Sequence, residues 1–326
     1  VIKGSWFLVV RLWFDAMPGV VTLSAAEFLG AFGAMAIVVG SIVALRQQRL
    51  KLLVAYSTIA QIGYLFLMFP LAFNVGGAAL THGAALDAGV LQAISHATAK
   101  AGMFMAAGLI YASLGHDRIA GLAGVARAMP LTVLAFALAG LALMGVLPSG
   151  AYLAKKLLLG AADDSGQWWW TIVLQGGAAF TAGYMVLVLA SVFRRPAEPV
   201  VLVKRVSKLS EAAALLLSVC SLLLAFTALG PVPGNLISNP LAVKELLTTL
   251  AVLFGGVLLA LAFSRQPLLA ASIRGHNGPA IGRVLMMWAS AFESLDRFAR
   301  RWPVAALALF VLAACFWMLL SGLPAF

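Results

Sequence analysis

Residues 24–45, SAAEFLGAFGAMAIVVGSIVAL, carry a single charge, that of Glu27. An α-helix rises 1.5 Å per residue, so about 20 apolar residues cross the hydrocarbon core of a bilayer, which is about 30 Å thick. Runs of this kind recur almost from one end of the chain to the other. The stretch predicts a transmembrane helix, and its repetition predicts an all-α protein that crosses the membrane several times.

The composition supports the same class. Of 326 residues, 63% are hydrophobic and 10% are charged, and the mean hydropathy is +1.03. Soluble domains have about 45–50% apolar and about 25% charged residues. A net charge of +11 would suit nucleic acid only if the basic residues shared one accessible face. Here they lie in short loops between apolar runs, which indicates a lipid bilayer and no nucleic acid.

The apolar runs predict about 8–9 transmembrane helices. The first, near 1–14, reads as a helix already under way, so we expect the chain to begin inside a longer protein. The others are expected near 24–45, 51–73, 87–112, 129–160, 167–193, 210–230, 245–264 and 303–322. The polar stretch 274–302 has apolar residues among its charges, which is typical of an amphipathic helix lying on the membrane surface.

Lysine and arginine are divided unequally between the alternate loops. One side holds two, Arg11 and Lys244, and four further lysines fall inside spans. The positive-inside rule makes the richer side cytoplasmic, and therefore predicts an inner (cytoplasmic) membrane protein. The richer side holds Arg46, Arg49, Lys51, Arg118, Arg127, Arg194, Arg195, Lys204, Arg205, Lys208, Arg265, Arg274, Arg283, Arg297, Arg300 and Arg301.

The run at 129–160 is too long for one straight helix, since it would reach about 48 Å. It contains Leu147-Pro148-Ser149-Gly150, and Pro148 lacks the N–H that a helix needs. We expect a broken helix with unwound backbone near the middle of the membrane, where protein or water satisfies the freed groups.

Buried lysines are the candidate functional residues, because an ionisable group at bilayer depth costs at least about 2.5–3.5 kcal/mol. Gln92, His96 and Lys100 fall at i, i+4 and i+8, which places them on one helix stripe. Such a stripe suits proton transfer between neighbours or through one water. The alternative is that Gln92 and His96 are core polar groups that only bind another helix.

Lys155 and Lys156 follow the predicted break and point about 100° apart, so we expect only one of them to face the polar interior. The alternative is that both are interfacial anchors.

Lys3 lies in the first span at a depth that the sequence leaves open. Tyr56, Ser57 and Gln61 put polar groups into the third span, either to bond neighbouring helices or to line a water path. Neither the cysteines nor the histidines form a ligand set, so we predict no cofactor and no metal.

Four stretches resemble one known family. Residues 53–64, LVAYSTIAQIGY, resemble the "LLAYSTISQIGY" segment of the antiporter-like subunits of respiratory complex I, of Mrp-type sodium/proton antiporters and of energy-converting membrane hydrogenases. Residues 96–102, HATAKAG, resemble the family's "HAxxKA" helix. Residues 147–155 resemble its "LPPxxGFxxK" broken helix, and residues 1–7 resemble its "LVKAGVY" helix.

The resemblance implies two inverted five-helix repeats. Residues 1–15 would end the first repeat, 24–193 would form the second, and 194–326 would add further helices and the cytoplasmic amphipathic helix. It also implies a proton relay in which Lys3 connects two half-channels, His96 and Lys100 pass protons on, and Lys155 controls exit.

Three functions follow. The first is proton translocation by a cofactor-free subunit of a redox-driven complex, such as an NADH:quinone oxidoreductase or a hydrogenase, together with other membrane subunits. The second is a subunit of a multi-chain sodium/proton antiporter. The third is a structural subunit, and an unrelated solute transporter is the remaining possibility.

Overall fold

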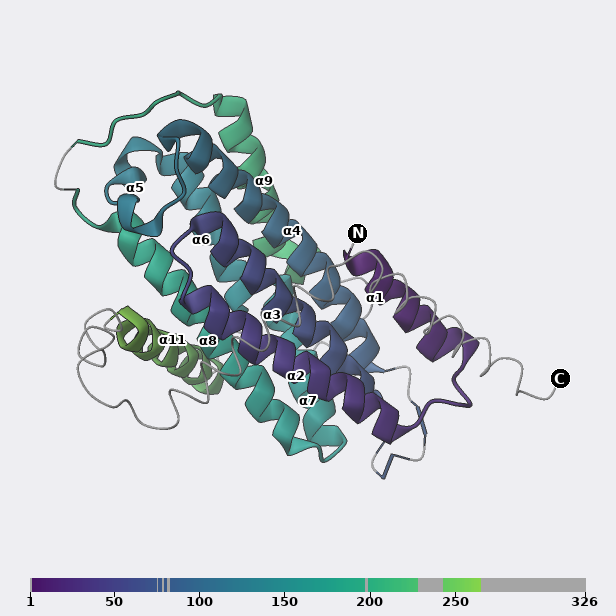
Figure 1. The fold of residues 1–326 in the computed structure, drawn as a ribbon. Helices are drawn as coiled ribbons and strands as arrows, with labels where there is room; N and C mark the ends of the chain where they lie inside the picture. Colours follow the sequence, from purple (N-terminus) through teal and green to yellow (C-terminus); the bar gives the residue numbers. More distant parts are fainter. Residues whose placement is uncertain are drawn as a thin grey trace, which may run out of the picture. The chain divides into compact units, whose positions relative to one another are not determined.

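The computed structural model describes residues 2–74, 76–77, 79–80, 83–196, 199–227 and 243–264. The elements, coloured along the chain in Figure 1, are α1 (Ile2–Arg11), the π-helix η1 (Leu12–Ala16), α2 (Leu23–Leu45), α3 (Leu50–Leu71), α4 (Ala84–Leu114), the short η2 (Ile119–Gly121) and α5 (Val125–Ala128), α6 (Pro130–Met144), α7 (Gly150–Asp164), α8 (Trp168–Phe193), α9 (Lys208–Leu223), η3 (Leu224–Thr227) and α11 (Val243–Ser264). No strand forms among these residues beyond two isolated bridges. The fold is all-α.

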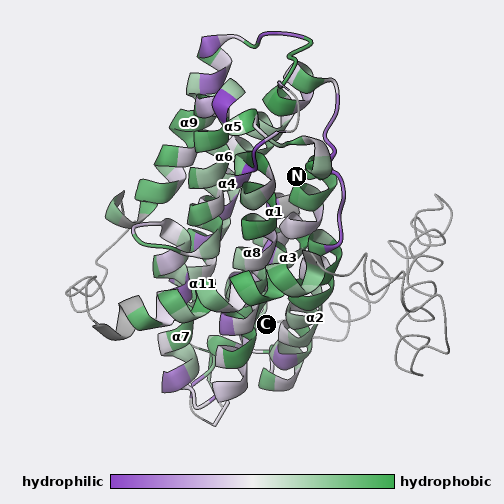
Figure 2. Ribbon diagram, turned by 90° about the vertical axis from the view of Figure 1, so that its left-hand side faces the viewer, coloured by the Kyte–Doolittle hydropathy of each residue, from purple (hydrophilic) through white to green (hydrophobic). Residues whose placement is uncertain are grey.

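Four helices, α2, α3, α4 and α8, are long and apolar enough to cross a membrane, and α6 and the apolar part of α11 are shorter. Apolar residues dominate these helices in Figure 2. The spans predicted at 24–45, 51–73, 87–112 and 167–193 match α2, α3, α4 and α8 within a few residues. The stretches predicted at 274–302 and 303–322 lie outside the described residues.

The chain leaves the helix between α6 and α7, within the run where the sequence predicts a break. Gly145 ends α6 in the left-handed region, at φ 74°, and Pro148 follows. Ser149 then starts α7, because its Oγ accepts a hydrogen bond of 3.1 Å from the N–H of Tyr152. Two 15-residue helices therefore take the place of one overlong helix.

The backbones of α2 and α3 approach each other closely through glycine. A Cβ on Gly40 would lie 2.7 Å from the backbone nitrogen of Ala60, and one on Gly33 would lie 2.6 Å from the carbonyl oxygen of Gly63. Only glycine fits at such a crossing. The contact fixes which face of α3 is turned towards α2, and the opposite face is free to meet α4 and α8.

Backbone hydrogen bonds join the loops at one end of the helical bundle. The Leu50 N–H donates to Asp117 O at 2.7 Å, Gly124 N–H to Arg194 O at 2.9 Å, and Val203 N–H to Ser113 O at 2.8 Å. This end, which we call the basic end, carries the described members of the basic set: Arg46, Arg49, Lys51, Arg118, Arg127, Arg194, Arg195, Lys204, Arg205 and Lys208. Because α8 ends here, the aromatic residues at its start lie at the opposite end (Figure 1).

An ion pair links two loops at the basic end. Arg49 Nε donates to Asp117 Oδ1 at 2.9 Å, and the Asp117 side chain is 3% exposed while that of Arg49 is 57% exposed. Burial acts to raise the pKa of Asp117, but the hydrogen bond and the charge of Arg49, together with hydrogen bonds from the backbone N–H groups of Lys51 and Asp117, outweigh it and hold the pKa below its ordinary value.

Candidate functional site

The polar stripe of α4 is buried among apolar helices. Gln92, His96 and Lys100 are 5%, 0% and 4% exposed, and their spacing of four residues keeps them on one face of the helix. This face is turned towards α3, which is shown by the hydrogen bonds of Gln92 and Lys100. The structure therefore brings together three of the residues predicted from the sequence.

Neutral oxygens of α3 hold the ammonium of Lys100. Its Nζ donates to the carbonyl oxygen of Val54 at 3.0 Å and to the hydroxyl of Ser57. Ser57 Oγ in turn donates to Val54 O at 2.9 Å. Among the described residues no carboxylate forms an ion pair with Lys100. A lysine without a fixed counter-ion can exist with or without its proton, which a salt-bridged lysine resists.

A chain of amide and hydroxyl groups continues from α4 through α3 to α8. Gln92 Nε2 donates to Gln61 Oε1 at 3.1 Å, and Gln61 Nε2 donates to Thr181 Oγ1 at 3.2 Å. Thr181 Oγ1 donates to the carbonyl oxygen of Gly177 at 3.0 Å. The predicted polar residues Ser57, Gln61 and Gln92 thus belong to one cluster that joins three helices.

Two buried tyrosines border this chain, and neither was among the residues singled out from the sequence. Tyr184 is 0% and Tyr64 6% exposed. The Tyr184 phenol lies beside Ser57, Gln61 and Thr181, and its oxygen has no well-formed hydrogen bond among the described groups. One signal was present: Tyr64 follows Gln61 by three residues, as Tyr184 follows Thr181, so each pair shares a helix face.

His96 lacks hydrogen-bond partners in the site. Its ring is fully buried, and within the described part of the chain neither Nδ1 nor Nε2 has a hydrogen-bond partner. The charges of Lys100 and of Lys3, which is half-buried on α1, both act on the imidazole. Buried polar atoms without a protein partner are places where water binds or a proton is exchanged.

Lys155 lies on the wall of a small cavity that also borders the amide chain. The cavity has a volume of about 20 Å³, and its lining includes Gln61, Tyr64, Gln92 and Lys155. A site of this size with several polar groups can hold about one water molecule. The neighbouring Lys156 points elsewhere, with its Nζ 6.0 Å from the centre of the Tyr152 ring.

Among the predicted polar residues of α3, Tyr56 is the one that the structure does not bring to this cluster. It lies one position away from Ser57, on the side of α3 turned towards α2, where its carbonyl oxygen lies close to Gly40. Its half-buried ring packs against apolar residues. No group of three or more His, Cys, Asp or Glu side chains that could hold a metal ion occurs in the part of the chain that the structure describes.

Fold and site together define a class: an apolar bundle with one broken helix, in which a buried lysine bonded to a carbonyl and a hydroxyl lies beside a chain of amide and hydroxyl groups. Residues 1–181 match the family described as the transmembrane region of NADH:quinone oxidoreductase and Mrp antiporter subunits. The chain belongs to this family.

Several curated proteins are similar to the chain. NADH-quinone oxidoreductase subunit N of Desulforudis audaxviator is 35% identical over 133 residues, which is 41% of this chain and 25% of that protein. The A/B subunit of the probable K⁺/H⁺ antiporter of Rhizobium meliloti is 34% identical over 156 residues, covering 48% of this chain and 14% of that protein. F420H2 dehydrogenase subunit M of Methanosarcina mazei is 32% identical over 131 residues, or 40% of this chain and 25% of that protein. The chain thus spans a quarter or less of the length of these relatives.

The fold is also similar to a chain in the solved structure of the Mrp complex from a Dietzia species. The TM-score is 0.58 at 22% identity, and the similarity covers 81% of this chain and 52% of that one. The chain is therefore a multi-pass membrane protein whose relatives are subunits of multi-subunit complexes.

Proposed function

We propose that the chain conducts protons across the membrane as one subunit of a larger redox-driven complex, without a cofactor of its own. The observation that carries the proposal is the buried ammonium of Lys100. It is held by neutral oxygens, and it lies on the same stripe as Gln92, which borders the cavity at Lys155.

Ser57 suits a proton transfer at Lys100, because a hydroxyl both donates and accepts. With Lys100 charged, Ser57 accepts from the ammonium and donates to Val54 O. Once Lys100 has lost its proton, the same hydroxyl can rotate and donate to the neutral amine. The site therefore accommodates both protonation states of Lys100 without moving a helix.

Lys155 is the proposed exit residue. A water in the cavity beside Gln61 and Gln92 would be oriented by two amides, each of which donates and accepts. Such a water can pass a proton to or from Lys155. On the other side of the stripe, His96 and Lys3 would continue the relay, since the charge of Lys3 acts on both His96 and Lys100.

The family membership supports the rest of the proposal. Residues 24–193 would be the second five-helix repeat, with α6 and α7 as its broken helix, residues 1–15 would end the first repeat, and 194–326 would add the extra helices. The basic end would face the cytoplasm, by the positive-inside rule, and an inner (cytoplasmic) membrane is the proposed location. Other membrane subunits are the proposed partners, because the relatives are named as subunits.

A subunit of an Mrp-type sodium/proton antiporter is the second candidate. Relatives named as antiporter subunits and the fold of the Mrp complex favour it. A sodium ion requires oxygen ligands and is repelled by a charged Lys100, so the site itself favours protons. A purely structural subunit would need its lysines only to hold helices together.

The test is to purify the complex through the tagged chain and to measure proton movement in vesicles that contain it. With Lys100→Ala we expect unchanged assembly and proton movement reduced at least about tenfold, because an aliphatic side chain cannot carry the proton. Iron or flavin in the complex supports the redox-driven form, and sodium-dependent pH changes without an electron donor support the antiporter. Unchanged proton movement would refute the relay, and lost assembly would favour a structural role.

A further inference from the structure

Helix α9 carries a buried polar face outside the site described above. Ser218 and Ser221 lie seven and ten residues after Glu211 along the helix. The exposures of Glu211, Ser218 and Ser221 are 2%, 0% and 0%, and α9 packs against α4 and α6. The opposite face bears exposed apolar residues such as Leu209 and Leu216. Burying a carboxylate and two hydroxyls inside an apolar bundle costs free energy, so their presence on one face calls for a reason.

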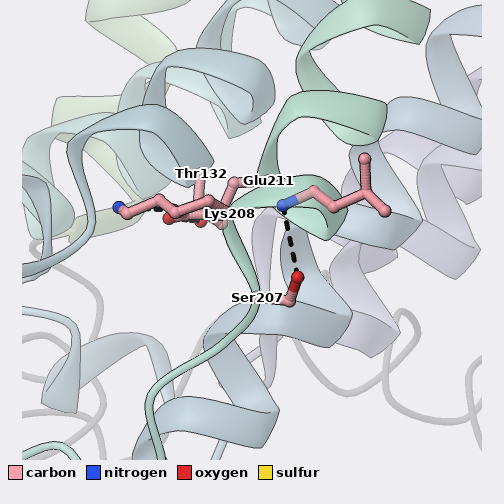
Figure 3. Close-up of polar contacts among 5 residues, drawn as sticks. Thr132, Ser207, Lys208 and Glu211 are labelled. Carbon is pink, nitrogen blue, oxygen red and sulfur yellow. Dashed lines mark hydrogen bonds and ion pairs between the residues drawn. The ribbon is translucent and has the colours of Figure 1, made fainter.

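Glu211 lies at the basic end next to Thr132 and Lys208 (Figure 3). Thr132 Oγ1 on α6 donates to its Oε1 at 2.7 Å, and Lys208 Nζ donates to its Oε2 at 2.8 Å. The Glu211 side chain is 2% exposed, whereas that of Lys208 is 79% exposed. These two are the described groups that act on the carboxylate. Glu211 is therefore a buried acid in contact with a cation that reaches the aqueous side.

The hydroxyls of α9 lead from this end towards the α4 stripe. A Cβ on Gly102 would lie 2.5 Å from Ser218 Oγ, so glycine keeps the space around this hydroxyl open. Ser221 Oγ donates to the carbonyl oxygen of Ser95 at 3.1 Å. Ser95 precedes His96, and its hydroxyl, like both His96 nitrogens, has no partner among the described residues.

We propose that α9 provides a proton intake route, in which Glu211 takes up a proton at the basic end and Ser218, Ser221 and Ser95 lead it to His96. The proton that binds the carboxylate leaves it again towards Ser218, and no other group changes. Seven residues of helix separate Glu211 from Ser218, about 10 Å, so water must bridge this interval. The route rests on the proposed function, because it delivers protons to the relay at His96 and Lys100.

The first test is Glu211→Gln in the assembled complex, measured as the initial rate of proton uptake from the basic end in vesicles. The amide keeps the shape of the side chain and still accepts from Thr132, but it cannot carry a proton. We expect an uptake rate at least about tenfold below that of the unmodified complex, and an uptake near normal for Glu211→Asp, which keeps the acid. An unchanged rate in an assembled Glu211→Gln complex would overturn the proposal.

The second test uses two neighbouring residues of α9. Ser221→Ala removes the hydroxyl that contacts Ser95, whereas Cys220→Ala changes the exposed side of the same helix turn. We expect slower uptake with Ser221→Ala only, and a Glu211→Gln/Ser221→Ala double variant no slower than Glu211→Gln, because the residues act in series. If Glu211→Gln fails to assemble, the comparison of Ser221→Ala with Cys220→Ala tests the proposal instead. Equal uptake rates for these two variants would overturn it.

The two proposals fail in different ways. If Lys100→Ala abolishes proton movement while Glu211→Gln and Ser221→Ala leave it normal, the relay stands and the α9 route is wrong. If Lys100→Ala moves protons at the normal rate, the relay itself is wrong.

Discussion

At the scale of single residues, the hydrogen bonds of Lys100 go to neutral oxygens and not to a carboxylate. Val54 O accepts from Lys100 and also from the hydroxyls of Ser57 and Thr58, the last at 2.9 Å. Of these two hydroxyls, only that of Ser57 also contacts the ammonium. We therefore expect Ser57 to influence how readily Lys100 keeps its proton, and Thr58 serves as the control.

Ser57→Ala should lower the rate of proton movement about tenfold. A hydrogen bond to a charged group contributes about 1.5–3 kcal/mol, and losing it disfavours the charged form of Lys100. Thr58→Ala removes a hydroxyl from the same carbonyl but not from Lys100, and should leave the rate within about twofold. The measurement is the initial rate of fluorescence quenching of a pH dye in vesicles, and equal rates for the two variants would contradict this role of Ser57.

At the scale of helices, the all-α class and the positions of the four long spans could be predicted from the sequence. Charged or glycine-rich loops separate the apolar runs, so predicted spans such as 24–45 match the observed helices within a few residues. The contacts between helices could not be predicted in the same way, because they depend on how each helix is rotated. Gly40 and Gly63 set the rotation of α3, which turns Tyr56 away from the site and Ser57 towards it.

The same limit applies to contacts between residues far apart in sequence. Thr181 meets Gln61 across 120 residues, and Glu211 meets Thr132 across 79. A stripe on one helix is visible in the sequence through its spacing of four, as with His96 and Lys100. Its partners on other helices become visible only once the helices are packed.

The ion pair at the basic end gives a pH-dependent prediction at this scale. Because the pKa of Asp117 is lowered in the folded protein, its stabilisation is fully present above the ordinary carboxyl pKa, about 3.9. It is lost as the pH falls through the lower, folded value. Asp117→Asn should therefore lower the free energy of unfolding by about 1–2 kcal/mol at pH 7, and this difference should shrink as the pH is lowered below about 4.

Thermal unfolding of the detergent-solubilised complex at several pH values measures this effect. Glu27→Gln is a suitable control, since the described residues give that carboxylate no ion pair. A gap between Asp117→Asn and the unmodified protein that stays constant down to the lowest pH would show that the charge of Asp117 is unimportant.

At the scale of the whole molecule, the polar face of α9 and the polar stripe of α4 lie next to each other inside one apolar bundle. The α9 face reaches Ser95 through Ser221, and the α4 stripe reaches the cavity at Lys155 through Gln92. The family to which the chain belongs includes subunits named for both redox enzymes and antiporters. The proposed relay would suit either, because a redox reaction or an existing ion gradient could drive protons through it.

The most direct test of the proposed relay compares Lys155→Ala with Lys156→Ala in the assembled complex. Both variants remove one lysine from the same turn of α7, but only Lys155 lines the cavity beside Gln61 and Gln92, whereas Lys156 lies near Tyr152. The quantity to measure is the initial rate of proton movement per assembled complex in vesicles. We predict at least about a tenfold loss with Lys155→Ala and a rate within about twofold of normal with Lys156→Ala. Equal rates for the two variants, or a greater loss with Lys156→Ala, would contradict the relay.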